Sequence, residues 1–235
     1  MVAAAADPPV LSVVIPALNE AACLAATLYP LQAMRRRGHE VIVVDGGSHD
    51  ATVRRAERLA DRVIESPRGR ARQMNAGARV ARGELLWFLH ADTRTPAQAD
   101  ALIIGALTAD GHDWGRFDIE LADGSVLLGW VARMMNLRSR LTGIATGDQG
   151  LFMTRAAFEH IGGFENIPLM EDIAASKALR RLSPPARLQA CLQTSARRWR
   201  RHGIIRTIVT MWGLRLAYFL GVPSQRLARY YTPHS

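Results

Sequence analysis

Residues 11–20 read LSVVIPALNE, a run of apolar and β-branched side chains, a proline, and then a polar pair that opens a helical pattern. A short apolar run without alternation, such as 11–15, is typical of a strand that is buried on both faces. The pattern returns in residues 41–50, VIVVDGGSHD, where the second strand, 41–44, ends in a turn rich in Asp, Gly and Ser. Alternation of strand and helix indicates a parallel sheet with right-handed crossovers.

The alternation continues outward from these two strands. In the first half we expect further strands at 62–65 and 84–89, and helices at about 19–37, 49–60, 70–81 and 95–108. The second half is less regular, and there we expect strands at 113–121 and 188–194, a helix at 125–141, and a loop entering a strand at 147–153. The predicted fold class is α/β, with a Rossmann-like, mostly parallel sheet and flanking helices in a single domain.

The length, the hydrophobic content and the net charge of the chain limit the classes of protein to which it can belong. The chain has 235 residues, of which 49% are hydrophobic, enough to bury the core of one domain. Its net charge of +9 comes from 30 basic and 21 acidic residues, and nearly all the basic ones are arginine. Arginine suits phosphate contacts, but arginine-rich codon usage explains the same excess.

The cysteines and the start of the chain bear on the expected compartment. Cys23 and Cys191 are far apart and in no C-x-x-C pair, so we expect neither a disulfide framework nor a structural zinc site. Residues 1–9 have no basic segment followed by an apolar core, unlike a signal peptide. We therefore expect a cytoplasmic protein.

Three polar clusters come directly after predicted strands: Asn19-Glu20, Asp45 to Asp50, and His90-Ala91-Asp92. In an open parallel sheet, ligands bind outside the carboxyl ends of the strands, so the clusters should converge on one cleft. Asn, Asp and Ser are also common in turns and helix caps for local reasons, which is the alternative for any one cluster. Three in succession favour a site.

The cluster His90-Ala91-Asp92 has the spacing of a metal site. Residues two apart in an extended segment point the same way. Oxygen ligands at that spacing can hold Mg²⁺ or Mn²⁺, which also takes diphosphate oxygens and neutralises a departing nucleoside diphosphate. Asp92 is the only acid of the pair and is the predicted metal ligand; His90 either binds metal as a neutral imidazole or packs near the diphosphate.

Four stretches in order resemble family 2 glycosyltransferases of the GT-A fold. SVVIPALNE (12–20) is similar to their first strand and loop, and VVDGGSHDAT (43–52) to their nucleotide-binding segment. His90-Ala91-Asp92 stands in the place of their D-x-D motif, and Gly162-Gly163-Phe164 with Glu171-Asp172 resembles their G-G-F…E-D pattern. The resemblance covers roughly residues 11–182. Gly46 stands where many members have a second acid, and His90 replaces the first D-x-D acid.

Four further stretches of the sequence are similar to a bacterial subset of this family, which is labelled radical-SAM/selenodomain-associated transferase and linked to arsenosugar biosynthesis. The matching stretches are GRARQMNAGA (69–78), LHADT (89–93), GDQG (147–150) and SARRW (195–199).

The resemblance implies an inverting glycosyltransferase that takes a nucleotide diphosphate donor, with a UDP-sugar favoured, and a small-molecule or lipid-linked acceptor. It implies that Asp172 is the general base and that Asp92 binds the Mg²⁺ or Mn²⁺ ion. The donor side would comprise Pro16, Asn19, Glu20, Asp45, Gly47, Ser48, Asp50, Arg70, Arg72, Asn75, His90 and Asp92. The acceptor side would comprise Asp148, Gln149, Glu171, Arg198 and Trp199.

Several of these residues have a plainer interpretation. Arg70 and Arg72 open a helix after Gly69, where they either hold phosphate or form a solvated basic face. Asp148 is either near the acceptor or a turn residue, and Glu171 is either a helix-start residue or a second candidate base. The arginines around Trp199 either bind an anion or form a basic loop.

The C-terminal segment 203–220 is apolar but interrupted by Arg206 and Arg215, so it is too short to span a bilayer. Ile205, Ile208, Trp212, Leu216 and Phe219 follow helical spacing on one face. We expect that face to pack on the core, with a homodimer interface or peripheral membrane contact as alternatives.

We divide the chain into a flexible lead-in (1–10), a nucleotide-sugar-binding half (11–110), an acceptor-side half (111–200), and a C-terminal amphipathic helix and tail (201–235). Two other functions were considered. A sugar nucleotidyltransferase would need a glycine-rich loop after the first strand, which residues 16–20 do not supply. A basic module that binds nucleic acid or anionic lipid conflicts with Asp45, Asp92 and Asp172, which would repel phosphates, so we expect no nucleic-acid partner.

Overall fold

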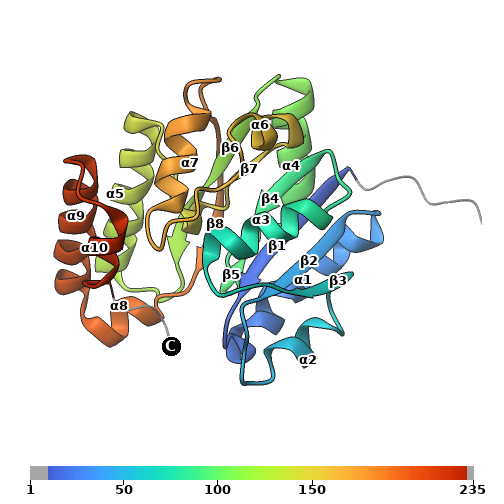
Figure 1. Cartoon of the computed structure of the whole chain (residues 1–235), viewed down its shortest axis with the longest axis horizontal. Coiled ribbons are helices and arrows are strands. Elements are labelled where there is room, and N and C mark those ends of the chain that lie inside the picture. Colours follow the sequence, from blue (N-terminus) through green and yellow to red (C-terminus); the bar gives the residue numbers. More distant parts are fainter. Residues whose placement is uncertain (1–9, 232–235) are drawn as a thin grey trace, which may run out of the picture.

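The computed structural model describes residues 10–231, apart from the side chains of residues 198 and 202, so the expected lead-in lies almost entirely outside the described residues (Figure 1). The strands are β1 (Leu11–Ala17), β2 (Glu40–Asp45), β3 (Arg62–Glu65), β4 (Leu85–Phe88), β5 (Thr93–Arg94), β6 (Trp114–Leu121), β7 (Phe152–Thr154) and β8 (Ala186–Thr194). The helices are α1 (Ala21–Arg36), α2 (Thr52–Ala56), α3 (Arg70–Val80), α4 (Ala99–Ile104), α5 (Val126–Thr142), α6 (Arg155–His160), α7 (Glu171–Leu179), α8 (Arg197–His202), α9 (Ile204–Phe219) and α10 (Ser224–Ala228). A π-helical turn follows α4, and a 3₁₀ turn (Gly147–Gln149) precedes β7.

The strands form one mixed sheet in the order β3-β2-β1-β4-β7-β6-β8-β5. The first four strands of that order are parallel, as predicted. The direction then reverses, because β7 pairs antiparallel with both β4 and β6, and β5 pairs antiparallel with β8. The predicted α/β class with a mostly parallel, Rossmann-like half is confirmed, and the second half completes the same sheet.

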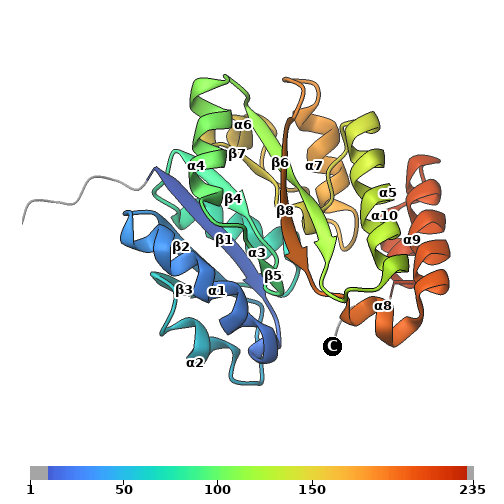
Figure 2. The ribbon, with the colours of Figure 1, turned by 180° about the vertical axis from the view of Figure 1, so that it is seen from behind.

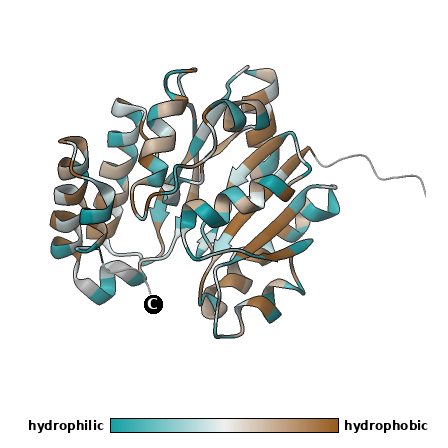
Figure 3. Cartoon of the chain, viewed as in Figure 1, coloured by the Kyte–Doolittle hydropathy of each residue, from teal (hydrophilic) through white to brown (hydrophobic). Residues whose placement is uncertain are grey.

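Both faces of the sheet are covered by helices, which explains the unbroken apolar strands. Val13 and Ile15 of β1 pack in one cluster with Leu24 and Leu28 of α1, whereas Val14 faces a second cluster on the opposite side. The first cluster also takes side chains from α4, seen in front of the sheet in Figure 2, and the second from α3, α6 and α7. Figure 3 shows the resulting hydrophobic strands between helices of mixed character.

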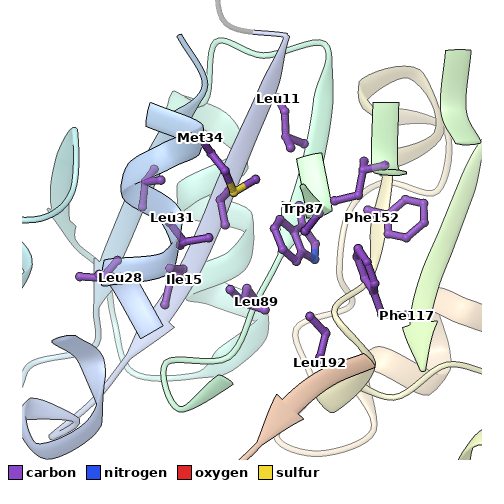
Figure 4. Close-up of a cluster of buried hydrophobic side chains, with 14 of the residues drawn as sticks. Leu11, Ile15, Leu28, Leu31, Met34, Trp87, Leu89, Phe117, Phe152 and Leu192 are labelled. Carbon is purple, nitrogen blue, oxygen red and sulfur yellow. The ribbon is translucent and has the colours of Figure 1, made fainter. Parts of the chain in front are cut away.

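An aromatic group joins the two halves of the sheet. The rings of Trp87 in β4 and Phe117 in β6 lie 5.5 Å apart between centroids, and Phe117 meets Phe152 of β7 edge-on at 5.6 Å (Figure 4). All three side chains are fully buried. Because these strands come from both the predicted donor half and the predicted acceptor half, the two halves share one core.

Several predicted boundaries were wrong. Strand β1 continues through Pro16 to Ala17; its pairing with β4 has already stopped at Val14, so the missing amide of the proline costs no bond on that side. The helix expected to reach residue 60 is only α2, because the chain must turn to place Asp61, whose amide donates to Val41, at the entry of β3. The helix expected from residue 95 begins at Ala99, because Thr93 and Arg94 pair with β8.

The expected packing of the C-terminal apolar face was also wrong. Trp212 and Phe219 of α9 are 61% and 76% exposed, so the face that contains them points outward. The helix instead packs on α7 and α10 through Leu214, which is buried with Leu169, Ile173 and Leu227. Among the helices within residues 10–231, none combines the length and the apolar character needed to cross a bilayer.

Candidate active site

A cleft of about 820 Å³ opens at the carboxyl ends of β1 and β4. The first half of the chain contributes the loop after β1, the start of α3 and the loop after β4. The second half contributes the 146–148 turn, the start of α7, and the helices α5 and α9. The predicted residues that line the cleft are Pro16, Glu20, Arg70, Arg72, His90, Asp92, Asp148, Glu171, Asp172 and Trp199.

Hydrogen bonds join the loop after β1 to the loop after β2, next to the residues that line the cleft. The amides of Gly47 and Ser48 donate to the Asp45 carboxylate at 3.0 and 2.9 Å. The Asn19 amide donates to the Ser48 hydroxyl at 2.8 Å, and the Asn19 side chain accepts from the His49 amide at 2.9 Å. These predicted donor residues therefore shape the rim of the cleft, and the Asp45 carboxylate is 3% exposed because it closes its own turn.

The start of α1 is fixed from the same direction. The Ala21 amide donates to Asp50 at 3.1 Å, and the Glu20 amide donates to the Thr52 hydroxyl at 2.8 Å. Both contacts satisfy amides of the first helical turn that have no partner within the helix. Asp50 thus positions Glu20 and does not itself line the cleft.

Gly46 has a steric reason to be glycine. A Cβ at this position would lie 3.0 Å from the side-chain amide of Gln73. That amide is buried and donates to the carbonyls of Ala17 and Val44, at the ends of β1 and β2. Gln73 was not predicted as a site residue, yet it holds the two strand ends together at the cleft, in the space that a second acid at position 46 would need.

Two acids of the cleft share one cation from α8. Arg197 Nη2 lies 2.7 Å from Glu20 Oε2 and 3.4 Å from Asp92 Oδ2. Burial raises the pKa of Glu20, and Asp92 adds to this, while Arg197 opposes it. Strand pairing explains the arrangement, because Thr93 lies opposite Thr194 and so brings the residues after β8 beside Asp92.

The Glu20–Asp92 pair fits a divalent ion in part. The two carboxylates already attract a cation at one point, which is the chemistry that Mg²⁺ and Mn²⁺ require. Within residues 10–231, however, no three His, Cys, Asp or Glu side chains are grouped so as to hold a metal ion. The protein alone therefore offers an incomplete site, which diphosphate oxygens and water would have to complete.

His90 contacts the turn that contains Gly147 and Asp148. Its Nδ1 lies 3.1 Å from Asp148 Oδ1, and a Cβ on Gly147 would lie 2.4 Å from its Nε2. Burial raises the pKa of Asp148, but its contact with His90 and the charges of Arg70 and Arg215 outweigh burial and bring the pKa well below the ordinary value. The geometry matches the packing alternative for His90 more closely than metal binding.

Asp172 faces the same turn from the start of α7. Its Oδ2 accepts from the Gly147 amide at 2.7 Å, and its Oδ1 accepts from the Ile173 amide. Met170, immediately before the helix, has a backbone φ of +71°, which residues other than glycine rarely adopt. Such backbone positions are common at functional sites, and this one turns the chain so that α7 begins at the cleft.

Glu171 is the more buried of the two adjacent acids. It is 6% exposed, and burial raises its pKa, with the neighbouring charge of Asp172 adding to the effect. A raised pKa is a property that general acids and bases often share. Both acids at the start of α7 are therefore candidates for proton transfer.

The close contact between Gly147 and His90 leads to a testable expectation. Gly147→Ala should push the His90 ring aside, disturb its pair with Asp148, and slow nucleotide release from the donor about tenfold or more. The free energy of unfolding should fall by about 1–3 kcal/mol because of overpacking. Gly129→Ala in α5 is the control, since nothing lies within 4 Å of its new methyl group. An unchanged rate in Gly147→Ala would show that the contact has no role in activity.

Arg70, at the start of α3, brings a positive charge to the cleft. Its side chain is exposed to the cleft and forms no ion pair within 4 Å among the described residues. The loss of water around the guanidinium within the cleft would by itself lower its pKa, but Tyr231 and the carboxylates around it raise the pKa above its ordinary value. The contributing carboxylates are those of Glu171, Asp148 and Asp172.

Three predicted site residues form hydrogen bonds within the protein. Asn75 donates to the Phe164 carbonyl and accepts from its amide, so both of its polar atoms are used. Gln149 is fully buried and caps the turn at Thr146. Arg72 lines the cleft but donates to Asn166 at 3.0 Å. The side chain of Arg198 lies outside the described residues.

A part of the cleft that was not predicted lies between α5 and α9. Its side chains are apolar apart from a threonine and two arginines, and the members are Leu127, Trp130, Val131, Met134, Met135, Arg138, Thr207, Ile208, Met211, Trp212 and Arg215. The helical spacing of apolar residues in 125–141 and 203–220 was the available signal, but the pattern does not say what a helix faces.

The family model described as Glycosyl transferase family 2 matches residues 12–155, more than half of the chain. Among curated proteins, the chain is similar to an undecaprenyl-phosphate 4-deoxy-4-formamido-L-arabinose transferase of Pseudomonas paraeruginosa, with 29% identity over 154 residues. That match covers 60% of this chain and 45% of the relative, so the chain spans less than half the length of this relative.

Two solved structures are similar in fold. A mannosyltransferase from Pyrobaculum calidifontis in complex with GDP-Man and Mn²⁺ has a TM-score of 0.65 at 21% identity, over 97% of this chain and 66% of that chain. S. aureus TarS in complex with UDP has a TM-score of 0.65 at 19% identity, over 79% of this chain and 60% of that chain. These likenesses confirm the predicted GT-A type of fold.

Proposed function

The chain belongs to glycosyl transferase family 2, and we propose that it is an inverting enzyme that moves a sugar from a nucleoside diphosphate donor to an acceptor hydroxyl. The observation that carries the proposal is the placement of two acidic groups, Glu20 with Asp92 and Glu171 with Asp172, in the lining of one cleft. The family match goes against the two alternatives considered above, a sugar nucleotidyltransferase and a non-catalytic basic module.

We assign the donor to the half formed by residues 11–110. The nucleoside would lie against Pro16 and the interlocked loops that contain Asn19 and Asp45, at the rim of the cleft. Arg70, which has no carboxylate partner, would face the diphosphate as a fixed positive charge. A UDP-sugar is favoured, and the similar structures with UDP and with GDP-Man support a nucleoside diphosphate as the class of donor.

Glu20 and Asp92 would hold a Mg²⁺ or Mn²⁺ ion together with the diphosphate. When bound, that ion would neutralise the negative charge that develops on the leaving nucleoside diphosphate. The carboxylates now share Arg197, so this guanidinium has to move or to join the diphosphate when a cation enters. The complex of the similar mannosyltransferase with Mn²⁺ supports the use of a divalent ion.

Asp172 would act as the general base for the acceptor. The oxygen of the acceptor hydroxyl attacks the anomeric carbon, the bond from that carbon to the diphosphate breaks, and the hydroxyl proton passes to the Asp172 carboxylate. Attack from the face opposite the leaving group inverts the anomeric configuration. The hydrogen bond from the Gly147 amide fixes the carboxylate, which lowers the cost of reaching the reactive geometry.

The more detailed assignment is a proposal as well. The four stretches between Gly69 and Trp199 quoted above favour the radical-SAM/selenodomain-associated subset and, through it, a role in arsenosugar biosynthesis.

Nucleotide release with water as the acceptor tests this function without knowledge of the natural acceptor. We expect one of UDP-glucose, UDP-GlcNAc and GDP-mannose to release its nucleotide slowly, and only with Mg²⁺ or Mn²⁺. Proton NMR at early times should show the β anomer of the freed sugar first, as inversion requires. Release of the α anomer first would contradict inversion, and release that is equal with and without metal would contradict the role of Glu20 and Asp92.

A further inference from the structure

The cleft continues past the acids at the start of α7 into a channel between α5 and α9, which lie at one end of the molecule (Figures 1 and 2). Four large apolar side chains of the lining come from these helices: Trp130 and Met134 from α5, and Met211 and Trp212 from α9. A nucleotide sugar has no apolar part that would fill such a channel. The lining therefore suits a ligand that has an apolar part.

Some of the apolar lining of the channel is exposed to solvent. Trp130 is 58% exposed and Met134 is 48% exposed, although both line the cleft. Trp212 of α9 is also exposed, at 61%, and lines the cleft. Exposed apolar side chains that line a cleft are typical of a site for an apolar ligand.

Two arginines lie inside this apolar channel. The Nε and Nη2 atoms of Arg138 are buried and have no hydrogen-bond partner among residues 10–231. Arg215 also lines the channel, and no carboxylate of the described residues lies within 4 Å of either guanidinium. Burial, together with the charge of Arg215, lowers the pKa of Arg138 to about 10.

An unpaired buried charge is costly, and it is usually compensated by a partner of opposite sign. Without a ligand, the positive charges of Arg138 and Arg215 repel each other. An anionic group placed between them would satisfy the free donors of Arg138 and remove the repulsion.

We propose that the acceptor is an anionic amphiphile whose apolar chain lies in the channel between α5 and α9 and whose anionic group is held by Arg138 and Arg215. This inference rests on the proposed function and names the acceptor class for the same site. Arg138 and Asp172 line the same cleft. An acceptor anchored at Arg138 would therefore lie in the cleft that also contains Asp172, where the proton and the glycosyl group are exchanged as described above.

Binding of dodecyl phosphate, measured by calorimetry below its micelle concentration, tests the proposal. Inorganic phosphate supplies the anion alone, and dodecyl maltoside supplies the chain with a neutral head. We expect dodecyl phosphate to bind at least about tenfold more tightly than either. Equal affinities for dodecyl phosphate and dodecyl maltoside would overturn the role of the arginines, and no binding of dodecyl phosphate would overturn the site.

Matched variants locate the binding. Arg138→Gln and Met134→Gln should each weaken dodecyl phosphate binding about tenfold or more. Arg206→Gln is the charge control, on the exposed side of α9. Leu137→Gln is the apolar control, because Leu137 is 46% exposed on the same helix as Met134 but does not line the channel. Equal losses in Leu137→Gln and Met134→Gln would contradict a specific site.

Two further measurements distinguish a wrong acceptor class from a structural role of Arg138 and from a wrong glycosyltransferase function. Arg138→Gln should unfold at the same temperature as the wild type or higher, because it removes an unpartnered buried charge; a lower temperature would assign Arg138 a structural role instead. Nucleoside diphosphate binding is measured in the same samples. If a nucleotide binds and dodecyl phosphate does not, the acceptor class is wrong and the glycosyltransferase function stands.

Discussion

Asp172→Asn is expected to slow transfer about 10²- to 10⁴-fold while leaving the affinity for the donor within about twofold. Asparagine has nearly the same shape, and its side-chain oxygen can still accept from the Gly147 amide, which now donates to Asp172 at 2.7 Å. The substitution therefore removes the basic carboxylate and keeps the bond to the turn, while the bond from the Ile173 amide to the second oxygen is lost. The rate is measured as nucleoside diphosphate release, and the affinity by calorimetry.

Glu171→Gln is the matched comparison for this prediction. Glu171 adjoins Asp172 and has a raised pKa, so it is the competing base. We expect a smaller loss of rate in Glu171→Gln than in Asp172→Asn. Full turnover in Asp172→Asn, with a large loss in Glu171→Gln, would show that the base is Glu171.

Asp92→Ala is expected to weaken metal-dependent donor binding by about tenfold to a hundredfold. The residue is one of the two acids that now share Arg197, and its loss leaves Glu20 as the sole carboxylate for the metal. Binding without metal should change little, because the missing carboxylate acts on the diphosphate only through the cation. Calorimetric titration of the nucleotide at several Mn²⁺ concentrations separates the two effects.

Asp123→Ala is the control for Asp92→Ala. Asp123 also pairs with an arginine of α8, since Arg200 Nε lies 2.8 Å from its carboxylate, but it does not line the cleft. Both variants release one contact of α8, and only one of them removes a predicted metal ligand. Equal losses of donor affinity in the two variants would mean that Asp92 acts by holding α8.

Local sequence patterns were sufficient for the parallel half of the sheet. The apolar runs around Val13, Val43 and Leu86 are buried on both faces, so each reads as a strand without help from the rest of the chain. The clusters after these strands converge because parallel strands end at one edge. For that reason Glu20, His90 and Asp92 could be placed in one cleft from the sequence.

Contacts between distant segments were not predictable in this way. Arg197 reaches Asp92 only because the two residues of β5 pair with β8, and β5 is too short to leave a pattern. Asp45 and Asn75 look like ligand-binding residues by type, but Asp45 accepts hydrogen bonds from its own turn and Asn75 bonds the backbone of Phe164. The choice between a backbone partner and a ligand depends on the tertiary fold.

The channel between α5 and α9 shows the same limit for helices. Periodicity correctly identified an apolar face that includes Trp212, but it cannot distinguish a face that meets the core from one that meets a ligand. The position of Arg138 in an apolar channel became evident only when the two helices were placed opposite each other. Burial of an unpartnered charge is a property of the fold.

Calorimetric titration of the wild-type protein with UDP, GDP and dTDP, each with and without Mn²⁺, tests the central claim most directly. The claim is that the cleft between Asp92 and Asp172 binds a nucleoside diphosphate through a shared divalent ion. We predict that one of the three nucleotides, with UDP favoured, binds in the micromolar to millimolar range only when Mn²⁺ is present. A folded sample that binds none of them under either condition would contradict the claim.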